Sequence, residues 1–593
     1  MKPRFTAVAS GAVVVFATLL FACAASDSAG TAPLSDNDKV SAAPAGQEEL
    51  PMGTLGAYLA GRHAQYGRDY GAAAEFYGRA LTGDPNDVEL MNRTLLLEVS
   101  EGRIGEAVRI APGIVAIQPE SPIAGLVLLL DDVKRGDFAA AEAKAAAMPQ
   151  DGVHRFVGPL LLAWAKEGQG QPVPAIAALQ PLAEIRGFQP LRDFHAALIA
   201  DLAGRTQEAE ENYLKVVNAT PRVNWRSVEM LGNLYERTGR PDQARALYER
   251  FIKDNPDSEF AEPALARLAA GQVPPPRLTN AREGIAEGLF DLASVLNQGE
   301  TSDLALLYGR LALDLRPDFP LAQLLVAEIL EAQQRPADAL TVLRTIDRAS
   351  PFGWSARLRA AADLDAIGKT DEAIDELKSM AADRPTRPQP LFELGDLLRT
   401  KSRFGEAVEA YDAAIARLPG GDVEPRQWTL LYSRAIALER SGQWGRAETD
   451  LKRALELQPE QPLVLNYLGY SWIDRGEHLD EALKMVERAV QLRPNDGYIV
   501  DSLGWAHYRL GDYGKAAEIL ERAVEMKPQD PTINDHLGDA YWQSGRQAEA
   551  KAQWQRALLF NPDAGEVKTI EAKLDRGLDK PTPAGPATAR GGG

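Results

Sequence analysis

The strongest pattern along the chain is a set of apolar and small residues that returns after 34 positions. The two clearest copies share residue types and spacing, and they contain Leu503-Gly504, Gly511, Ala516, Leu520, Ala523 and Pro528, then Leu537-Gly538, Gly545, Ala550, Trp554, Ala557 and Pro562. Matching residues at one fixed period indicate a structural repeat. One such unit cannot bury its apolar face alone, so it must stack on its neighbours.

Each recurring residue has a physical role in a pair of helices. The small Gly538 allows two helices to cross closely, while Tyr541 and Trp554 fill the space between the helices of one unit. Gly545 lies where the chain must reverse, which favours a residue that tolerates positive φ. Pro562 ends the second helix.

These residues and their spacing resemble the tetratricopeptide repeat, whose unit is a pair of antiparallel helices. The resemblance implies an all-α fold, a right-handed α-solenoid of about 14 helix-turn-helix units in two segments, with about eight units in the second. In this family the first helix of each unit lines a concave groove.

The same marks divide the chain into segments. The expected order is a signal peptide (1–23), a flexible tether (24–52), degenerate repeats (53–256), a capping helix and proline-rich linker (257–285), more regular repeats (286–564), a capping helix (565–576) and a disordered tail (577–593). The linker is predicted because Val273-Pro274-Pro275-Pro276 fits neither a helix interior nor a central strand. Residues 154–189 show no clear repeat, since Pro172, Pro174 and Pro181 interrupt the expected second helix.

The first residues have the pattern of an export signal. Lys2 and Arg4 precede an apolar run over 5–22. The run ends in Leu-Phe-Ala before Cys23, the one cysteine of the chain, which resembles a bacterial lipobox. With Ala24 next, that resemblance implies lipidation of Cys23 and an outer-membrane lipoprotein that faces the periplasm. Cleavage near Ala24 to leave a soluble periplasmic protein, or an uncleaved anchor, are the alternatives.

Composition and charge exclude several classes of function. The net charge is −19, which argues against nucleic acid as a partner, because phosphate binding needs a basic face. The six histidines are scattered and cysteine occurs once, so no metal-ligand spacing appears. Nothing combines a nucleophile, a base and an orienting group. We therefore expect no enzyme activity, no cofactor, no metal and no small-molecule substrate.

The first helices of the last three repeats carry residues that folding alone does not require. At the positions that the family resemblance places in the groove are Asn466, Tyr470, Tyr498, Asp501, Trp505, Tyr508, Asp535, Asp539 and Trp542. Aromatic side chains of this kind are enriched in binding hot spots. The sequence therefore predicts a protein or peptide partner, an extended or helical segment with apolar and basic side chains. The alternative is that these rings pack on the neighbouring repeat.

The function predicted is that of a non-enzymatic scaffold or adaptor in the bacterial cell envelope. The run Leu465-Asn466-Tyr467-Leu468-Gly469-Tyr470 and its continuation to 562 resemble outer-membrane repeat lipoproteins of Gram-negative bacteria. The resemblance implies recruitment of a periplasmic protease to its substrates. A scaffold of a secretion, assembly or polysaccharide-export complex is the alternative.

Overall fold

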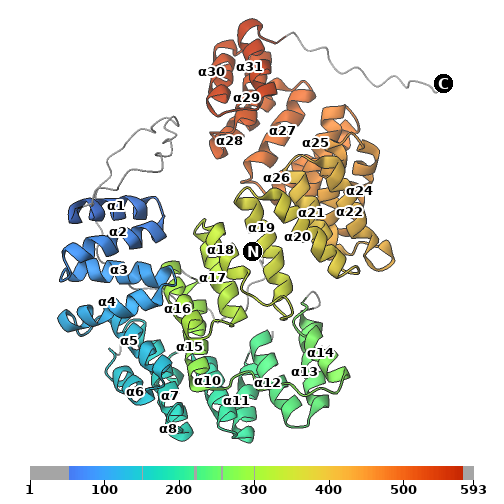
Figure 1. Cartoon of the computed structure of the whole chain (residues 1–593). Helices are drawn as coiled ribbons and strands as arrows, with labels where there is room; N and C mark the ends of the chain where they lie inside the picture. Colours follow the sequence, from blue (N-terminus) through green and yellow to red (C-terminus); the bar gives the residue numbers. More distant parts are fainter. Residues whose placement is uncertain (1–52, 150, 220–223, 256–257, 299–300, 579–593) are drawn as a thin grey trace. The chain divides into compact units, whose positions relative to one another are not determined.

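The computed structural model describes residues 53–149, 151–219, 224–255, 258–298 and 301–578, and every regular element in these ranges is a helix. The expected signal, its Cys23, the tether and most of the tail lie outside the described residues. The chain divides into two compact units, Met1–Ala373 and Ile374–Gly593. Figure 1 gives the helix labels used below.

The first unit holds nineteen complete helices among its described residues. They are α1 (Thr54–Tyr66), α2 (Tyr70–Gly83), α3 (Val88–Ser100), α4 (Ile104–Ile117), α5 (Pro122–Arg135), α6 (Phe138–Ala146), α7 (His154–Glu167), α8 (Pro172–Ala178), α9 (Gln180–Ala183), α10 (Gln189–Leu202), α11 (Thr206–Asn218), α12 (Trp225–Arg237), α13 (Pro241–Asp254), α14 (Glu262–Ala269), α15 (Ala281–Leu296), α16 (Ser302–Leu315), α17 (Pro320–Ala332), α18 (Pro336–Leu343) and α19 (Gly353–Ala366).

The chain passes from the first unit to the second within α20 (Thr370–Asp383). The second unit continues with α21 (Gln389–Thr400), α22 (Phe404–Ala416), two short 3₁₀ turns η1 (Pro419–Gly421) and η2 (Pro425–Gln427), α23 (Trp428–Arg440), α24 (Trp444–Leu457), α25 (Pro462–Arg475), α26 (Leu479–Leu492), α27 (Gly497–Arg509), α28 (Tyr513–Met526), α29 (Pro531–Gln543), α30 (Gln547–Leu559) and α31 (Ala564–Arg576).

The expected all-α solenoid of helix pairs is confirmed, and the recurring residues act as predicted. A Cβ added at Gly538 would overlap the Trp554 indole, which is fully buried, so only glycine permits this helix crossing. Gly545 adopts φ +87° at the turn between α29 and α30. The unclear stretch 154–189 forms one unbroken helix followed by two short ones, because Pro172 begins α8 and Pro181 lies in the first turn of α9.

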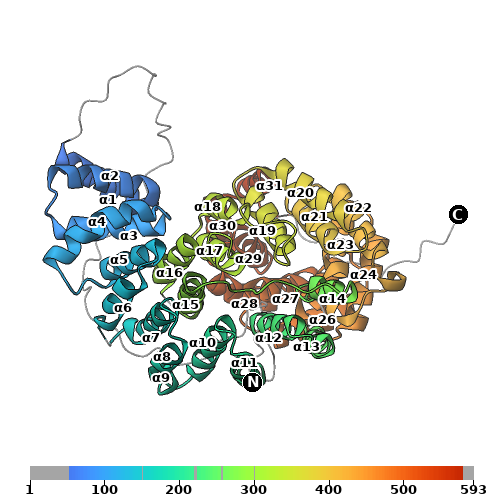
Figure 2. The same ribbon diagram turned by 60° about the horizontal axis from the view of Figure 1, so that its bottom comes forward.

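The helix pair α15 and α16 packs back onto the first helices of earlier repeats. α15 contacts α7 and α10, while α16 contacts α3 and α5, as both views show for these yellow-green and blue-to-green helices (Figure 1, Figure 2). The approach is close because α15 has glycine at the contact, where a Cβ at Gly284 would overlap the Trp164 ring. The proline stretch before α15 therefore lies inside the first unit, and Asn233 Nδ2 donates to the Pro275 carbonyl at 2.9 Å.

Charged and polar groups fix this contact in register. Glu287 on α15 is fully buried and accepts hydrogen bonds from the guanidinium groups of Arg226 on α12 and Arg316, which follows α16. Beside it the Trp164 indole N–H donates to His195 Nδ1 at 3.0 Å. That bond leaves His195 Nε2 to donate to Asp291 Oδ2 at 3.1 Å. A buried carboxylate is tolerated only when its partners are well placed, so these groups specify one position for α15.

Further along, α16 is held by contacts with the second and third repeats. Arg310 Nε donates to the Ser100 carbonyl at 3.1 Å, and Lys134 pairs with Asp314 at 2.9 Å. The first helices of these repeats are the ones that the family resemblance places on the groove side. Within the first unit, that side is therefore covered by a later segment of the same chain.

We expect Gly284→Ala to destabilise the first unit by about 1–3 kcal/mol, because the added methyl group must displace the Trp164 ring from a packed interface. Gly288→Ala, one turn later on α15, is the matched control. Its Cβ would lie 3.5 Å from Leu160, an ordinary contact, so that variant should be neutral or slightly more stable. Urea unfolding of the full chain, followed by circular dichroism, measures both. Equal unfolding free energies for the two variants would contradict the close approach of α15.

Candidate functional site

The nine predicted groove residues lie on three successive first helices of the second unit, α25, α27 and α29. The structure places them in three different environments. Five remain at least partly accessible and form no salt bridge, namely Asn466, Tyr470, Tyr498, Trp505 and Tyr508. The other four are buried pairs or lie under the last helix. The nine predicted residues therefore divide into a partly accessible group centred on aromatic side chains, and a group with structural roles that comprises three carboxylates and Trp542.

Trp505 is the centre of the aromatic group. Its ring stacks on Tyr508, with centroids 4.7 Å apart, and on His536 of α29, with centroids 4.1 Å apart. The Trp505 Nε1 atom is shielded from solvent and has no hydrogen-bond partner among the described residues. On α25, Asn466 Oδ1 is shielded and unpartnered in the same way. Such groups need an explanation, because a buried polar atom without a partner is unfavourable.

Two tyrosines flank this centre. Burial, and then the negative charge of Asp501, raises the pKa of Tyr470 to about 12, so its hydroxyl group stays protonated and can donate. Tyr498 is 53% exposed at the start of α27, with the Lys527 ammonium 5.0 Å from its ring centroid. The aromatic part of the predicted surface thus extends from α25 across α27.

Asp501 is not an open carboxylate, because it forms a buried pair with His536. His536 Nδ1 lies 3.0 and 3.1 Å from the two Asp501 oxygens. Burial by itself lowers the pKa of His536, but the charge of Asp501 and its hydrogen bond outweigh that effect and raise the pKa above its usual range. In the sequence His536 is one of six scattered histidines, since its partner Asp501 is 35 positions away.

The last three predicted residues lie against α31 and the two residues after it. Lys573 Nζ bridges Asp535 at 2.7 Å and Asp539 at 2.8 Å. The Trp542 indole N–H donates to the Leu578 carbonyl at 3.0 Å. Burial, and then Asp535, raises the pKa of Asp539 to about 6, against the opposing charge of Lys573. These three residues hold the final helix in place, so they offer little surface to a partner.

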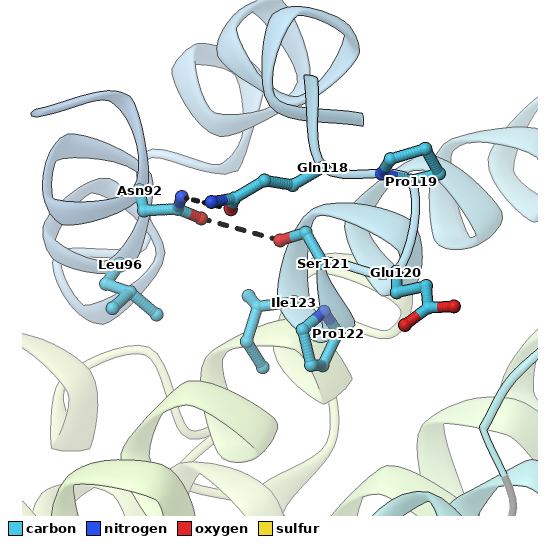
Figure 3. Close-up of a pocket in the computed structure, with 8 residues that line it drawn as sticks. All are labelled: Asn92, Leu96, Gln118, Pro119, Glu120, Ser121, Pro122 and Ile123. Atoms are coloured by element: carbon cyan, nitrogen blue, oxygen red, sulfur yellow. Dashed lines mark hydrogen bonds between the residues drawn. The ribbon is translucent and has the colours of Figure 1, made fainter. Parts of the chain in front are cut away.

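A separate open cleft lies in the first unit beside α3 and the turn into α5 (Figure 3). Its volume is about 750 Å³, and Leu96 and Ile123 form its apolar wall. The polar wall is satisfied internally, because Asn92 donates to Gln118 at 3.1 Å and accepts from Ser121 at 3.4 Å. These three side chains are therefore linked to one another along the cleft wall.

No group of three or more His, Cys, Asp or Glu side chains is placed to hold a metal ion in the part of the chain that the structure describes. Among those same residues, no helix has the length and apolar character needed to span a bilayer. What the second unit offers is a surface of stacked rings and unpartnered polar atoms, which suits binding.

Known proteins share the repeat. Family models described as tetratricopeptide repeat match residues 225–268, 308–353, 358–422, 432–497, 472–535 and 507–574. A TPR repeat-containing protein of Pseudomonas aeruginosa is 28% identical over 187 residues, which is 31% of this chain and 30% of that protein. Tetratricopeptide repeat protein 13 of Homo sapiens is 26% identical over 24% of this chain and 16% of its own length. The chain thus spans less than a third of either relative.

Solved structures show the same kind of helix pairs with little sequence in common. Yeast Tom70 covers 88% of this chain and 95% of its own, at 14% identity and a TM-score of 0.34. A tetratricopeptide repeat protein from Parabacteroides merdae covers 43% of this chain and 98% of its own, at 14% identity and a TM-score of 0.36. No functional conclusion follows from likenesses at this level.

The Asp501–His536 pair predicts a pH-dependent stability. Because the pKa of His536 is raised in the folded protein, the stability it contributes is complete below the unfolded value of about 6.5 and is lost as the pH rises through the folded value. Each unit of pKa shift corresponds to about 1.4 kcal/mol. His536→Gln should therefore flatten the pH dependence of the unfolding free energy above about pH 6.5. His63→Gln, at an exposed position on α1, is the control and should keep the pH dependence of the unchanged chain.

Proposed function

Because this chain belongs to the tetratricopeptide repeat family, we propose that it is a protein-binding scaffold of the bacterial cell envelope that takes its partner on the first helices of its second unit. The repeats themselves make it a protein–protein interaction scaffold. The site of partner binding, the compartment and the role of the complex are taken in turn below.

One observation carries the choice of the second unit. In the first unit, α15 and α16 cover the first helices α3, α5, α7 and α10 of the earlier repeats. Within the second unit, the main helix contacts in the described residues are between helices near in sequence, so α25 and α27 carry no such covering pair. A partner can therefore use these helices without first displacing part of the same unit.

The chemistry of this surface favours an apolar partner segment. Trp505, Tyr508 and Tyr470 supply ring faces, and such side chains lose little conformational entropy on binding. The predicted groove carboxylates are paired within the second unit, Asp501 with His536 and Asp535 with Lys573. Paired carboxylates attract basic side chains of a partner less strongly, whereas the aromatic rings still favour apolar ones.

The envelope location rests on the first 23 residues. Their charged start, apolar run and Cys23 support export and lipid anchoring at the outer membrane, with a soluble periplasmic form as the alternative. A scaffold held there would bring two periplasmic proteins together. We favour the recruitment of a carboxyl-terminal-processing protease to its substrates, on the likeness of residues 460–562 to outer-membrane repeat lipoproteins. An export or assembly complex is the other candidate.

We expect Trp505→Ala to reduce partner capture at least about tenfold, because the ring is the centre of the partly accessible aromatic group. Trp505→Phe keeps a ring to stack on His536 but removes the unpartnered N–H, and should weaken capture by about fivefold, the value of one hydrogen bond. The measurement is capture from detergent-solubilised membranes by the chain from residue 24, identified by mass spectrometry and then quantified with the purified partner.

Trp444→Phe is the matched control for that experiment. Its Nε1 is also shielded and unpartnered, but it lies on the second helix α24. Capture should survive in this variant, and unfolding free energies should show that Trp505→Phe is folded. Capture that persists in both Trp505 variants would rule out this surface. Recovery of export components in place of a protease would favour the alternative complex.

A further inference from the structure

The first helix of the array, α1, exposes several large apolar side chains on its outer face. It packs on α2 through Tyr58, whose ring centroid lies 5.8 Å from that of Tyr77, and through small residues, since Ala57 is 1% exposed and a Cβ at Gly61 would meet the Tyr77 ring. The opposite face carries large apolar side chains, with Leu55 71%, Leu59 52% and Tyr66 92% exposed. Surface helices normally bury the large apolar residues and expose the polar ones.

These exposed residues form one stripe. Positions 55, 59, 62 and 66 are four, three and four residues apart, so they share one side of the helix. Arg62 therefore lies between Leu59 and Tyr66 on the same side. An isolated exposed leucine needs no explanation, but a stripe along a whole helix does.

The charge around the stripe is opposite to that of the chain. From position 51 to position 68 there are two arginines, Arg62 and Arg68, and no Asp or Glu, although the whole chain carries −19. Neither arginine forms a salt bridge with any residue that the structure describes, and both are exposed. Both charges are thus available to an external anionic group.

The two ends of the repeat array differ in whether a further helix covers the terminal repeat. At the far end, α31 covers the last repeat and Lys573 fixes it there. At the near end, no described helix lies on the exposed side of α1, whose main contact is with α2. A terminal repeat normally needs a polar outer face. An apolar and basic outer face therefore indicates that something covers it.

We propose that the exposed face of α1 binds an anionic lipid surface, lying in the headgroup layer with Leu55, Leu59 and Tyr66 inserted and Arg62 paired with lipid phosphates. Helices of this composition bind membrane interfaces through apolar burial and attraction to anionic lipids. Chain order supports this occupant, because the apolar run 5–22 and Cys23 precede α1 in the sequence.

This binding does not depend on acylation of Cys23 or on the partner surface of the second unit. It would hold the first repeat against the membrane while the later repeats extend from it. A second copy of the chain packing through α1, or a protein that covers the stripe, are the other possible occupants, and the experiment distinguishes them.

The test uses the chain from Ala24 onward, which keeps every described helix, and vesicles of phosphatidylglycerol with phosphatidylcholine or of phosphatidylcholine alone. We expect co-flotation with the anionic vesicles and little with the neutral ones. Leu55→Asp with Leu59→Asp should weaken binding by about tenfold or more, and Arg62→Gln by about fivefold on anionic vesicles only. Leu559→Asp, at a 76% exposed position on α30, is the control that should bind as the unchanged chain does.

Because the chain is strongly acidic, non-specific attraction to anionic vesicles is not expected. Failure of the unchanged chain to float, or equal flotation of the Leu55→Asp/Leu59→Asp variant, overturns the proposal. Sedimentation velocity is run in parallel. A dimer that dissociates in the same variant would show that a second copy covers α1 and would also overturn it. None of these outcomes changes what the Trp505 variants report.

Discussion

The packing of α15 against α7 and α10 is the contact on which the first unit depends. It is built on a close approach at Gly284, where the Trp164 ring takes the space of a side chain, and on a fully buried Glu287 between two arginines. Desolvating three charged groups is unfavourable unless all of them are paired. The contact is therefore specific in position, and it folds a linear array back on itself. A repeat array without it would leave the first helices of its early repeats open along their whole length.

The repeat itself was predictable because its determinants are local. Gly538, Gly545, Trp554 and Pro562 act within one unit and its neighbour, so a period of 34 residues reveals them. The return of α15 was not predictable in this way. Gly284 and Glu287 occupy ordinary helical positions, and their partners Trp164 and Arg226 are far away in the chain. The triproline stretch predicts a stiff link, but stiffness carries no information on which surface the next helix will meet.

The candidate site shows the same division between local and distant causes. The rings of Tyr470, Trp505 and Tyr508 stood out because the repeat does not require them, and the structure brings Trp505 and Tyr508 into one stack. The carboxylates looked equally available in the sequence, yet Asp501 is paired with His536 and Asp539 with Lys573. Those partners are 35 and 34 residues away, at positions where neither histidine nor lysine is part of the repeat pattern. The position of a residue in the repeat predicts that its side chain points toward the groove. Whether that side chain is accessible there depends on the residues of the neighbouring repeat.

Each terminal face and each groove of a repeat array leaves helix surface without a packing partner. In two places this chain covers such a surface with its own helices. The pair α15 and α16 covers the early first helices, and α31 covers the last repeat through a lysine shared by two carboxylates. In both places the covering segment brings charged groups that match the surface beneath. Among the described residues, the aromatic side of α25 and α27 and the outer side of α1 lack such a cover. They differ in chemistry, since one presents stacked rings with unpartnered polar atoms and the other leucines with unpaired arginines. A single partner would have to suit both, so two different ligands, a protein segment and an anionic lipid surface, account for them more simply.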